Sequence, residues 1–330
     1  MIATLPCATA MLAAGGLWQR LVETPLYHQA FAGSVAIALL CGVLSVFVVL
    51  KRMSFIGQGI SHAAFGGVGV AVLVELLLVM RWPQLASGMD SSGAMGLLRD
   101  AIIAVFCVAT AIAIGVISRR GKLAQDTAIG ISLVAAMAVG VILVDIRSQY
   151  RATASFESIL FGSIFFIART DVWTAWILAI VVVALVLLLF KEMVFFAFDE
   201  ETAAVFGVPT GLLYYGLLTC LGLAIVVAMK SLGVILASAL LILPGASARF
   251  WSRRIGIVTF LSALISVGGL AAGLLLSIAL RTVPPGAVIV LTLTGIFILS
   301  YAVQAIRRAL ARRQAPPASP PPGASTMDKQ

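Results

Sequence analysis

Apolar residues occur in long runs along nearly the whole chain, and short polar or basic stretches separate these runs. A helix that crosses a bilayer needs about 20 mostly apolar residues. The pattern therefore predicts an all-α polytopic membrane protein with about nine transmembrane helices, near residues 30–50, 55–80, 100–118, 127–145, 171–190, 211–229, 231–249, 255–280 and 286–306. Only Lys230 and Ser231 separate the sixth run from the seventh, which favours either a tight turn or one long bent element with a snorkelling lysine.

The runs divide the chain into three parts. Residues 1–29 are expected to form an N-terminal interfacial segment, since no basic region precedes their apolar stretch as it would in a signal peptide. Residues 30–313 form the transmembrane domain. Residues 314–330 are rich in Pro, Ala and Ser, which is typical of a disordered tail. Between the fourth and fifth runs, residues 156–163 are amphipathic and too short to span a membrane.

Composition supports a membrane protein over a soluble one. Hydrophobic residues make up 62% of the chain and charged residues only 11%, whereas a soluble domain carries about 25% charged residues. The net charge of +9 comes from short basic clusters between apolar runs, so it indicates membrane topology and not nucleic-acid binding. The four cysteines lack the spacing of a metal or redox motif and are interpreted as packing residues.

The basic clusters also predict an orientation in the membrane. Cytoplasmic loops carry an excess of Lys and Arg. The strongest clusters follow the odd-numbered runs, at residues 51–52, 119–122, 249–254 and 307–313. This pattern places the N-terminus outside and the C-terminus in the cytoplasm, in the inner membrane of a bacterium.

The second run carries the clearest polar residues inside an apolar segment. Gln58 and His62 are four residues apart, so they lie on one face of a helix. Ionisable residues inside a membrane are costly and often mark a substrate path, and an imidazole suits a divalent transition metal. A histidine that only packs against another helix is the alternative. Glu75, toward the outer end of the same run, is a further candidate for the path of a cation.

Residues 199–207 predict a short helix outside the bilayer. Asp199 is a favourable N-cap, the carboxylates of Glu200 and Glu201 suit the positive end of a helix, and Gly207 suits its C-terminal stop. Ala203 and Phe206 would form a small apolar face, which either docks into a partner or rests on the membrane surface.

The chain shows no catalytic triad and no phosphate-binding loop of the Gly-Lys-Ser/Thr type. We therefore expect a transport subunit and not an enzyme. If transport is driven by ATP, hydrolysis would occur on a separate subunit.

Six stretches, taken in order, resemble the membrane permease of ABC-type metal importers for zinc, manganese or iron. The helix around Ser61-His62-Ala63 is similar to the family's Gly-Asp-x-x-Ser-His-Ala helix, and Phe198 to Gly207 resembles its cytoplasmic coupling helix. The other four stretches are 126–131, 159–163, 232–246 and 285–287. Any one of these matches has little specificity, so the resemblance rests on their occurring together in the same order.

The resemblance implies partners and a site. An ATP-binding subunit, an extracytoplasmic metal-binding protein and a second permease copy or paralogue would complete the transporter, and no cofactor would be tightly bound. The divalent metal would pass transiently along His62 and Gln58. Gln58 departs from the family pattern, which commonly has Asp there, and an amide oxygen attracts a divalent cation less strongly than a carboxylate. A different metal, a chelated metal, or a carboxylate from another subunit would each be compatible with this change.

Two other functions fit parts of the sequence. A permease for siderophore, haem or corrinoid has a similar helix-rich build and would not depend on an imidazole. A secondary transporter driven by an ion gradient would work without an ATPase.

Overall fold

Helices account for nearly all of the residues that the structure describes, and none of these residues lies in a strand. The computed structural model describes residues 25–84, 88–89, 93–121, 123–148, 168–280 and 283–314. The amphipathic stretch at 156–163, residues 1–24 and residues 315–330 lie outside this set.

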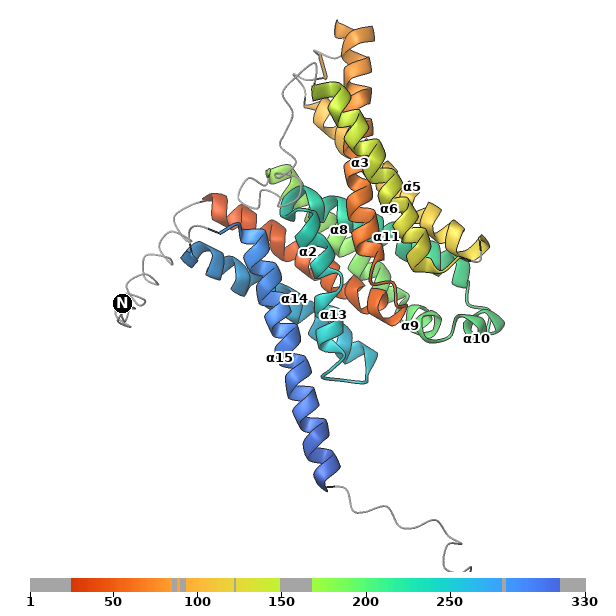
Figure 1. Cartoon of the computed structure of the whole chain (residues 1–330), viewed down its shortest axis with the longest axis vertical. Helices are drawn as coiled ribbons and strands as arrows, with labels where there is room; N and C mark the ends of the chain where they lie inside the picture. Colours follow the sequence, from red (N-terminus) through yellow and green to blue (C-terminus); the bar gives the residue numbers. More distant parts are fainter. Residues whose placement is uncertain are drawn as a thin grey trace, which may run out of the picture.

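Eight of the helices are long and apolar enough to cross a membrane (Figure 1). They are α2 (Pro25–Leu50), α3 (Ile56–Arg81), α5 (Ala94–Arg120), α6 (Gln125–Ser148), α8 (Arg169–Leu188), α11 (Thr210–Leu232), α14 (Ile255–Leu280) and α15 (Pro285–Gln314). Four shorter helices complete the described chain: α9 (Phe190–Phe198), α10 (Glu200–Val205), α12 (Val234–Leu240) and α13 (Leu243–Ala248).

The predicted crossing at 231–249 is present as two short helices, α12 and α13. The chain leaves α11 through Gly233, whose φ of 86° is the left-handed conformation that favours glycine. It is back at the opposite end of the bundle by Gly245, whose backbone N–H donates to the Ser45 hydroxyl near the end of α2 at 2.8 Å. Lys230 and Ser231 lie inside α11, so the break between the sixth and seventh runs comes at Gly233, and the crossing that follows is itself broken between α12 and α13.

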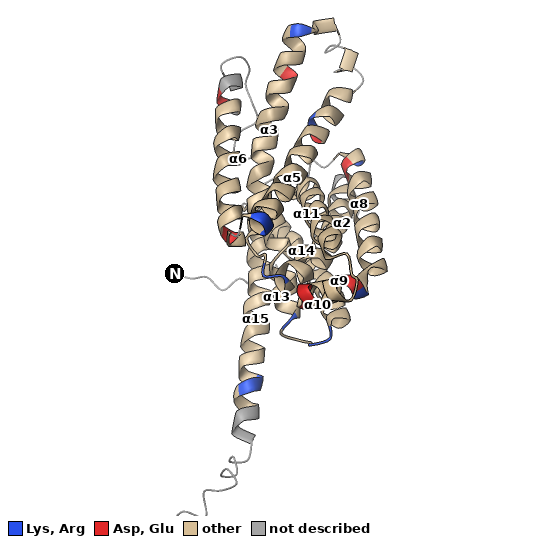
Figure 2. Ribbon diagram, turned by 90° about the vertical axis from the view of Figure 1, so that its right-hand side faces the viewer, with Lys and Arg blue, Asp and Glu red and all other residues tan. Residues whose placement is uncertain are grey.

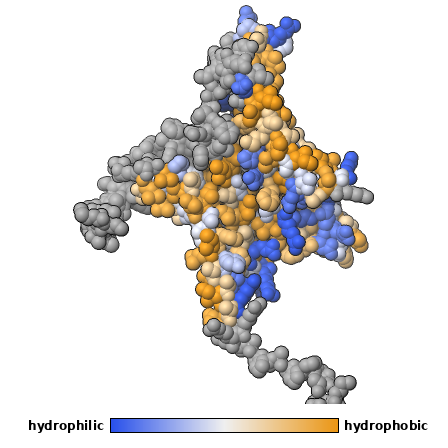
Figure 3. Space-filling model, viewed as in Figure 1, coloured by the Kyte–Doolittle hydropathy of each residue, from blue (hydrophilic) through white to orange (hydrophobic). Residues whose placement is uncertain are grey.

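Charged residues gather toward the ends of the bundle and leave long uncharged stretches of helix between them (Figure 2). We call one end the α10 end, because Lys51, Arg119 and Glu200 meet there. We call the other the Lys230 end. The surface between them is mostly apolar, with hydrophilic residues concentrated toward the ends (Figure 3). This distribution is what a bilayer requires of a spanning protein.

Helix α2 is the centre of the fold, with 78% of its span buried inside the protein. It packs against α14 through hydroxyl groups that bond to its backbone. Ser262 donates to the carbonyl of Gly42 at 2.6 Å, and Ser266 donates to the carbonyl of Ala38 at 2.7 Å. Small residues and interhelical hydrogen bonds are the usual means by which helices associate inside a membrane.

Helices α3 and α6 approach each other backbone to backbone, and glycines make this contact possible. A Cβ added at Gly66 would lie 2.6 Å from the carbonyl oxygen of Ala136. A Cβ added at Gly140 would lie 2.8 Å from the carbonyl oxygen of Phe65 and 3.0 Å from the nitrogen of Gly66. Because these neighbours are backbone atoms, a larger residue at either position forces the two helices apart.

Replacing Gly140 with alanine is therefore expected to destabilise the protein by about 1–3 kcal/mol, the usual cost of overpacking. The measurement is the thermal unfolding midpoint of the purified protein in detergent. Gly216→Ala is the matched control, because nothing lies within 4 Å of a Cβ added at that helical position. Equal midpoints for the two variants would show that the α3–α6 contact does not need a glycine at position 140.

Candidate functional site

The polar face predicted on the second run lies near the start of α3. Gln58 is exposed on the surface of the single chain and His62 is half-buried one turn further on. Gly57, Gly59 and Gly66 of the same helix are buried, and Gly59 and Gly66 face α6. These glycines bring α3 close to its neighbours around the two polar side chains.

Glu75 does not belong to this group. It is half-buried on α3, but the rise of an α-helix separates it from His62 by roughly 20 Å. The structure therefore brings Gln58 and His62 together and places Glu75 in the other half of the helix.

A cavity of about 270 Å³ opens beside Gln58, between α3 and α6. Its lining contains one carboxylate, that of Asp126, together with the amide of Gln58. The other lining residues are Phe55, Ile129, Gly130 and Leu133. A carboxylate and an amide oxygen are ligands that a hard divalent cation accepts.

Asp126 is the residue of this cavity that sequence reasoning missed. Its position at the start of an apolar run is typical of a helix N-cap, but α6 begins at Gln125, so Asp126 lies inside the first turn. In the sequence, Asp126 is indicated by the segment 126–131, which resembles the family. Its proximity to Gln58 depends on the packing of α3 against α6. Within the described residues, no group of three or more His, Cys, Asp or Glu side chains could hold a metal ion.

The predicted short helix at 199–207 is present as α10. The Asp199 side chain accepts a hydrogen bond from the backbone N–H of Thr202 at 3.0 Å, as an N-cap does. Hydrogen bonds from the Thr202 hydroxyl and from this backbone N–H hold the pKa of the Asp199 carboxyl below its usual value. Gly207 has a φ of 83°, so the chain leaves the helix through a conformation that favours glycine.

The apolar face of α10 differs from the prediction in one residue. Ala203 is fully buried against its own chain and does not lie on an exposed face. Phe206 is 74% exposed, and Val205, at 85%, takes the place expected of Ala203.

Glu200 ties α10 to two spanning helices. Its carboxylate forms an ion pair with Lys51, just after α2, at 2.8 Å, and a second with Arg119, in the last turn of α5. Both cations also lie over aromatic rings, Lys51 over Phe196 at 3.8 Å and Arg119 over Tyr214 at 4.4 Å. From the sequence, Glu200 is expected only to interact with the positive end of the helix. Its ion pairs with Lys51 and Arg119 are seen only in the structure.

Burial, and to a lesser extent repulsion from Arg119, lower the pKa of Lys51 to about 8. Raising the pH from 7 to 9 is therefore expected to remove the charge of Lys51 and its ion pair with Glu200. The folded protein binds this proton less tightly than the unfolded chain, so global stability is not expected to fall over this range. The expected effect is local, a loss of order in α10.

The measurement is hydrogen–deuterium exchange of residues 200–206, corrected for the intrinsic effect of pH. Lys51→Arg is the control, because a guanidinium keeps its charge at pH 9. The native protein is expected to lose protection between pH 7 and 9 while the Lys51→Arg variant keeps it. Parallel curves would contradict a role for the charge of Lys51.

A second charged group lies at the Lys230 end. The Lys230 ammonium contacts Asp100 of α5 at 2.6 Å and Asp171 of α8 at 2.8 Å. Asp171 stands at the start of an apolar run, a position typical of an N-cap, but it lies within the first turn of α8, whose N-cap is Ala168. Lys230 of α11 thus joins α5, α8 and α11 at this end.

The fold and these groups define a polytopic transporter subunit, with a polar face on one spanning helix and a short capped helix at one end. Residues 23–304 match the ABC 3 transport family. The chain therefore belongs to this family of ABC transporter membrane subunits, which are not enzymes and work with a separate ATPase.

Curated relatives and solved structures agree with this assignment. The chain is 30% identical to the manganese transport system membrane protein MntC of Halalkalibacterium halodurans, over 86% of this chain and 89% of the relative. It is 28% identical to the manganese import system permease protein ScaB of Streptococcus gordonii, over 89% and 97%. A chain of PsaBC from Streptococcus pneumoniae, solved in complex with Fab, superposes with a TM-score of 0.74 at 27% identity, over 91% and 99%.

Proposed function

We propose that this chain is the permease subunit of an ATP-driven importer of divalent metal ions, with manganese as the cargo. The observation that carries the proposal is the similarity to permeases named for manganese, which extends over most of both chains. The cavity beside Gln58 supports it, because its carboxylate and amide oxygens are ligands suited to manganese.

The metal path follows the polar face of α3. Gln58 is exposed in the single chain, so a second permease copy or a paralogue is needed to enclose it. His62, Gln58 and Asp126 would contact the ion in succession. Conduction needs sites that bind the ion and then release it, which suits a few spaced ligands better than a closed cage.

The α10 end would face the cytoplasm. Lys51, Arg119 and the arginines after α13 and at the end of α15 lie toward this end, and basic residues favour the cytoplasmic side. This orientation places the N-terminus outside and the C-terminus inside the inner membrane. The ATP-binding subunit would then receive Val205 and Phe206 of α10, and the metal-binding protein would dock at the Lys230 end.

A permease for chelated metals is the second candidate. An inward-facing metal-chelate type ABC transporter superposes with a TM-score of 0.57, but its identity of 13% shows the fold alone. The cavity beside Gln58 has a volume of about 270 Å³, and a carboxylate is among the groups that line it. This size and charge suit a bare cation better than a bulky chelate.

The test is uptake by proteoliposomes that contain the permease, its ATP-binding subunit and its metal-binding protein. We expect ATP-dependent uptake of manganese and no uptake of an iron–siderophore complex. Liposomes without ATP are the control. Manganese uptake that continues without ATP would indicate a secondary transporter, and preferential uptake of the chelate would favour the second candidate.

A further inference from the structure

Five exposed arginines gather where the connection between α13 and α14 meets α15. Arg249, Arg253 and Arg254 belong to the connection, and Arg307 and Arg308 to α15. The ion pairs among the described residues use other cations, namely Lys51, Arg119 and Lys230. This part of the surface therefore carries a positive charge that no described carboxylate compensates.

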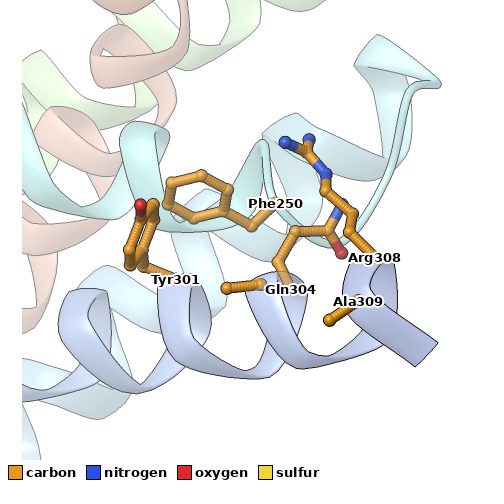
Figure 4. A pocket seen from close by; sticks show the side chains of 6 residues that line it. Phe250, Tyr301, Gln304, Arg308 and Ala309 are labelled. Carbon is orange, nitrogen blue, oxygen red and sulfur yellow. The ribbon is translucent and has the colours of Figure 1, made fainter. Parts of the chain in front are cut away.

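A cavity of about 230 Å³ lies within this basic surface. Tyr301, Gln304 and Arg308 project from one face of α15 toward Phe250 of the α13–α14 connection (Figure 4). Their spacing of three and four residues places them on that face. The other lining residues are Ala305 and Ala309, whose small side chains leave the space open. The cavity thus combines an apolar floor with hydroxyl, amide and guanidinium groups.

Aromatic contacts hold the walls of this cavity in place. The Phe250 ring packs against Phe297 and Tyr301, each with ring centroids 5.7 Å apart. The indole N–H of Trp251 donates to the Ser300 hydroxyl at 3.1 Å. These contacts fix the α13–α14 connection to α15, so the cavity is formed before any ligand binds.

Apolar side chains follow the cavity along α15. Ile298, which is 60% exposed, lies one turn before Tyr301 on the same face of the helix. Leu299, Ile306 and Leu310 are 64%, 59% and 53% exposed on the other side of α15. A ligand that fits both surfaces has an anionic head and a long apolar tail. Membrane phospholipids with anionic headgroups have this chemistry, and juxtamembrane arginines attract them.

We propose that this cavity binds the phosphate-bearing headgroup of an anionic phospholipid from the cytoplasmic leaflet. Arg308 contacts the phosphate, Gln304 and Tyr301 donate hydrogen bonds to headgroup oxygens, and the acyl chains lie along Ile298. The choice of leaflet rests on the orientation proposed above, whereas the site itself does not.

The test is the retention of phosphatidylglycerol by the purified permease in native mass spectrometry, titrated against phosphatidylcholine. Arg308→Gln is expected to weaken phosphatidylglycerol binding about fivefold, the effect of one basic residue near an anionic lipid. Gln304→Glu keeps the shape of the cavity and is expected to weaken binding at least as much, since its carboxylate repels the phosphate and pairs with Arg308. Arg81→Gln, an exposed arginine at the Lys230 end of α3, is the matched control and is expected to bind like the native protein.

Two results would overturn the proposal. One is equal retention of phosphatidylglycerol by the native protein and by the Arg308→Gln and Gln304→Glu variants. The other is that these variants retain the lipid unchanged but co-purify less of the ATP-binding subunit, which would make the surface a protein-docking site. Neither readout depends on metal transport, so failure here is distinguishable from failure of the proposed function.

Discussion

Replacing Glu200 with glutamine is expected to lower ATP-driven metal uptake about tenfold, within the range of typical coupling free energies between sites. The carboxylate of Glu200 joins α10 to Lys51 and Arg119, and so to the ends of α2 and α5. Without it, two cations face each other across a short distance and repel. Movements of α10 would then reach the spanning helices less effectively, while α10 itself keeps its Asp199 cap.

The measurement is the ATPase rate and the metal uptake of the same proteoliposomes. In the Glu200→Gln variant, ATP hydrolysis is expected to continue while uptake falls, which is the sign of lost coupling. Glu192→Gln is the matched control, because Glu192 lies on neighbouring α9 and forms no ion pair among the described residues. The double variant Arg119→Gln/Glu200→Gln is expected to take up as much metal as Glu200→Gln alone, because each substitution removes the same interaction. Additive losses would contradict this shared role.

The spans and α10 could be predicted because their causes are local. Runs of about 20 apolar residues are enough to place a membrane helix, and a cap at Asp199 with a glycine at 207 is enough to place a short one. The pairs of Glu200 were not predictable in this way. Lys51 is 149 positions away in the sequence, and only the packing of α9 and α10 under α2 brings the two together.

The candidate metal path likewise has one part that the sequence predicts and one part that it does not. The spacing of Gln58 and His62 predicts that they share a face of α3, and the structure places both near the start of that helix. The carboxylate that lines the cavity with Gln58 comes from a different helix, since Asp126 lies in the first turn of α6. Its proximity to Gln58 depends on the close α3–α6 approach, which Gly66 and Gly140 permit.

Replacing His62 with alanine is expected to lower manganese uptake at least about tenfold, the loss that follows removal of groups which only support a metal ligand. The imidazole lies one turn beyond Gln58 on the same face of α3 and is a nitrogen ligand suited to manganese. The measurement is manganese uptake by proteoliposomes with the intact ATP-binding subunit. Unaltered uptake would exclude His62 from the path.

The carboxylate of Asp126 offers a sharper test, because it can be moved across the cavity. Asp126→Asn is expected to lower manganese uptake, since it leaves two amides where the ion has one amide and one carboxylate. Adding Gln58→Asp to that variant returns a carboxylate to the same 270 Å³ cavity and is expected to restore uptake. Asp145→Asn, at the far end of α6, is the matched control and is expected to retain uptake.

Restoration in the double variant would show that the cavity needs one negative charge and accepts it from either helix. Gln58→Asp alone places two carboxylates there, so it is expected to bind manganese more tightly and to release it more slowly. Its uptake should then saturate at a lower metal concentration with a lower maximal rate. If the double variant transports no better than Asp126→Asn, the two positions do not serve the same ion, and the role of Asp126 lies in the packing of α6 and not in the metal path.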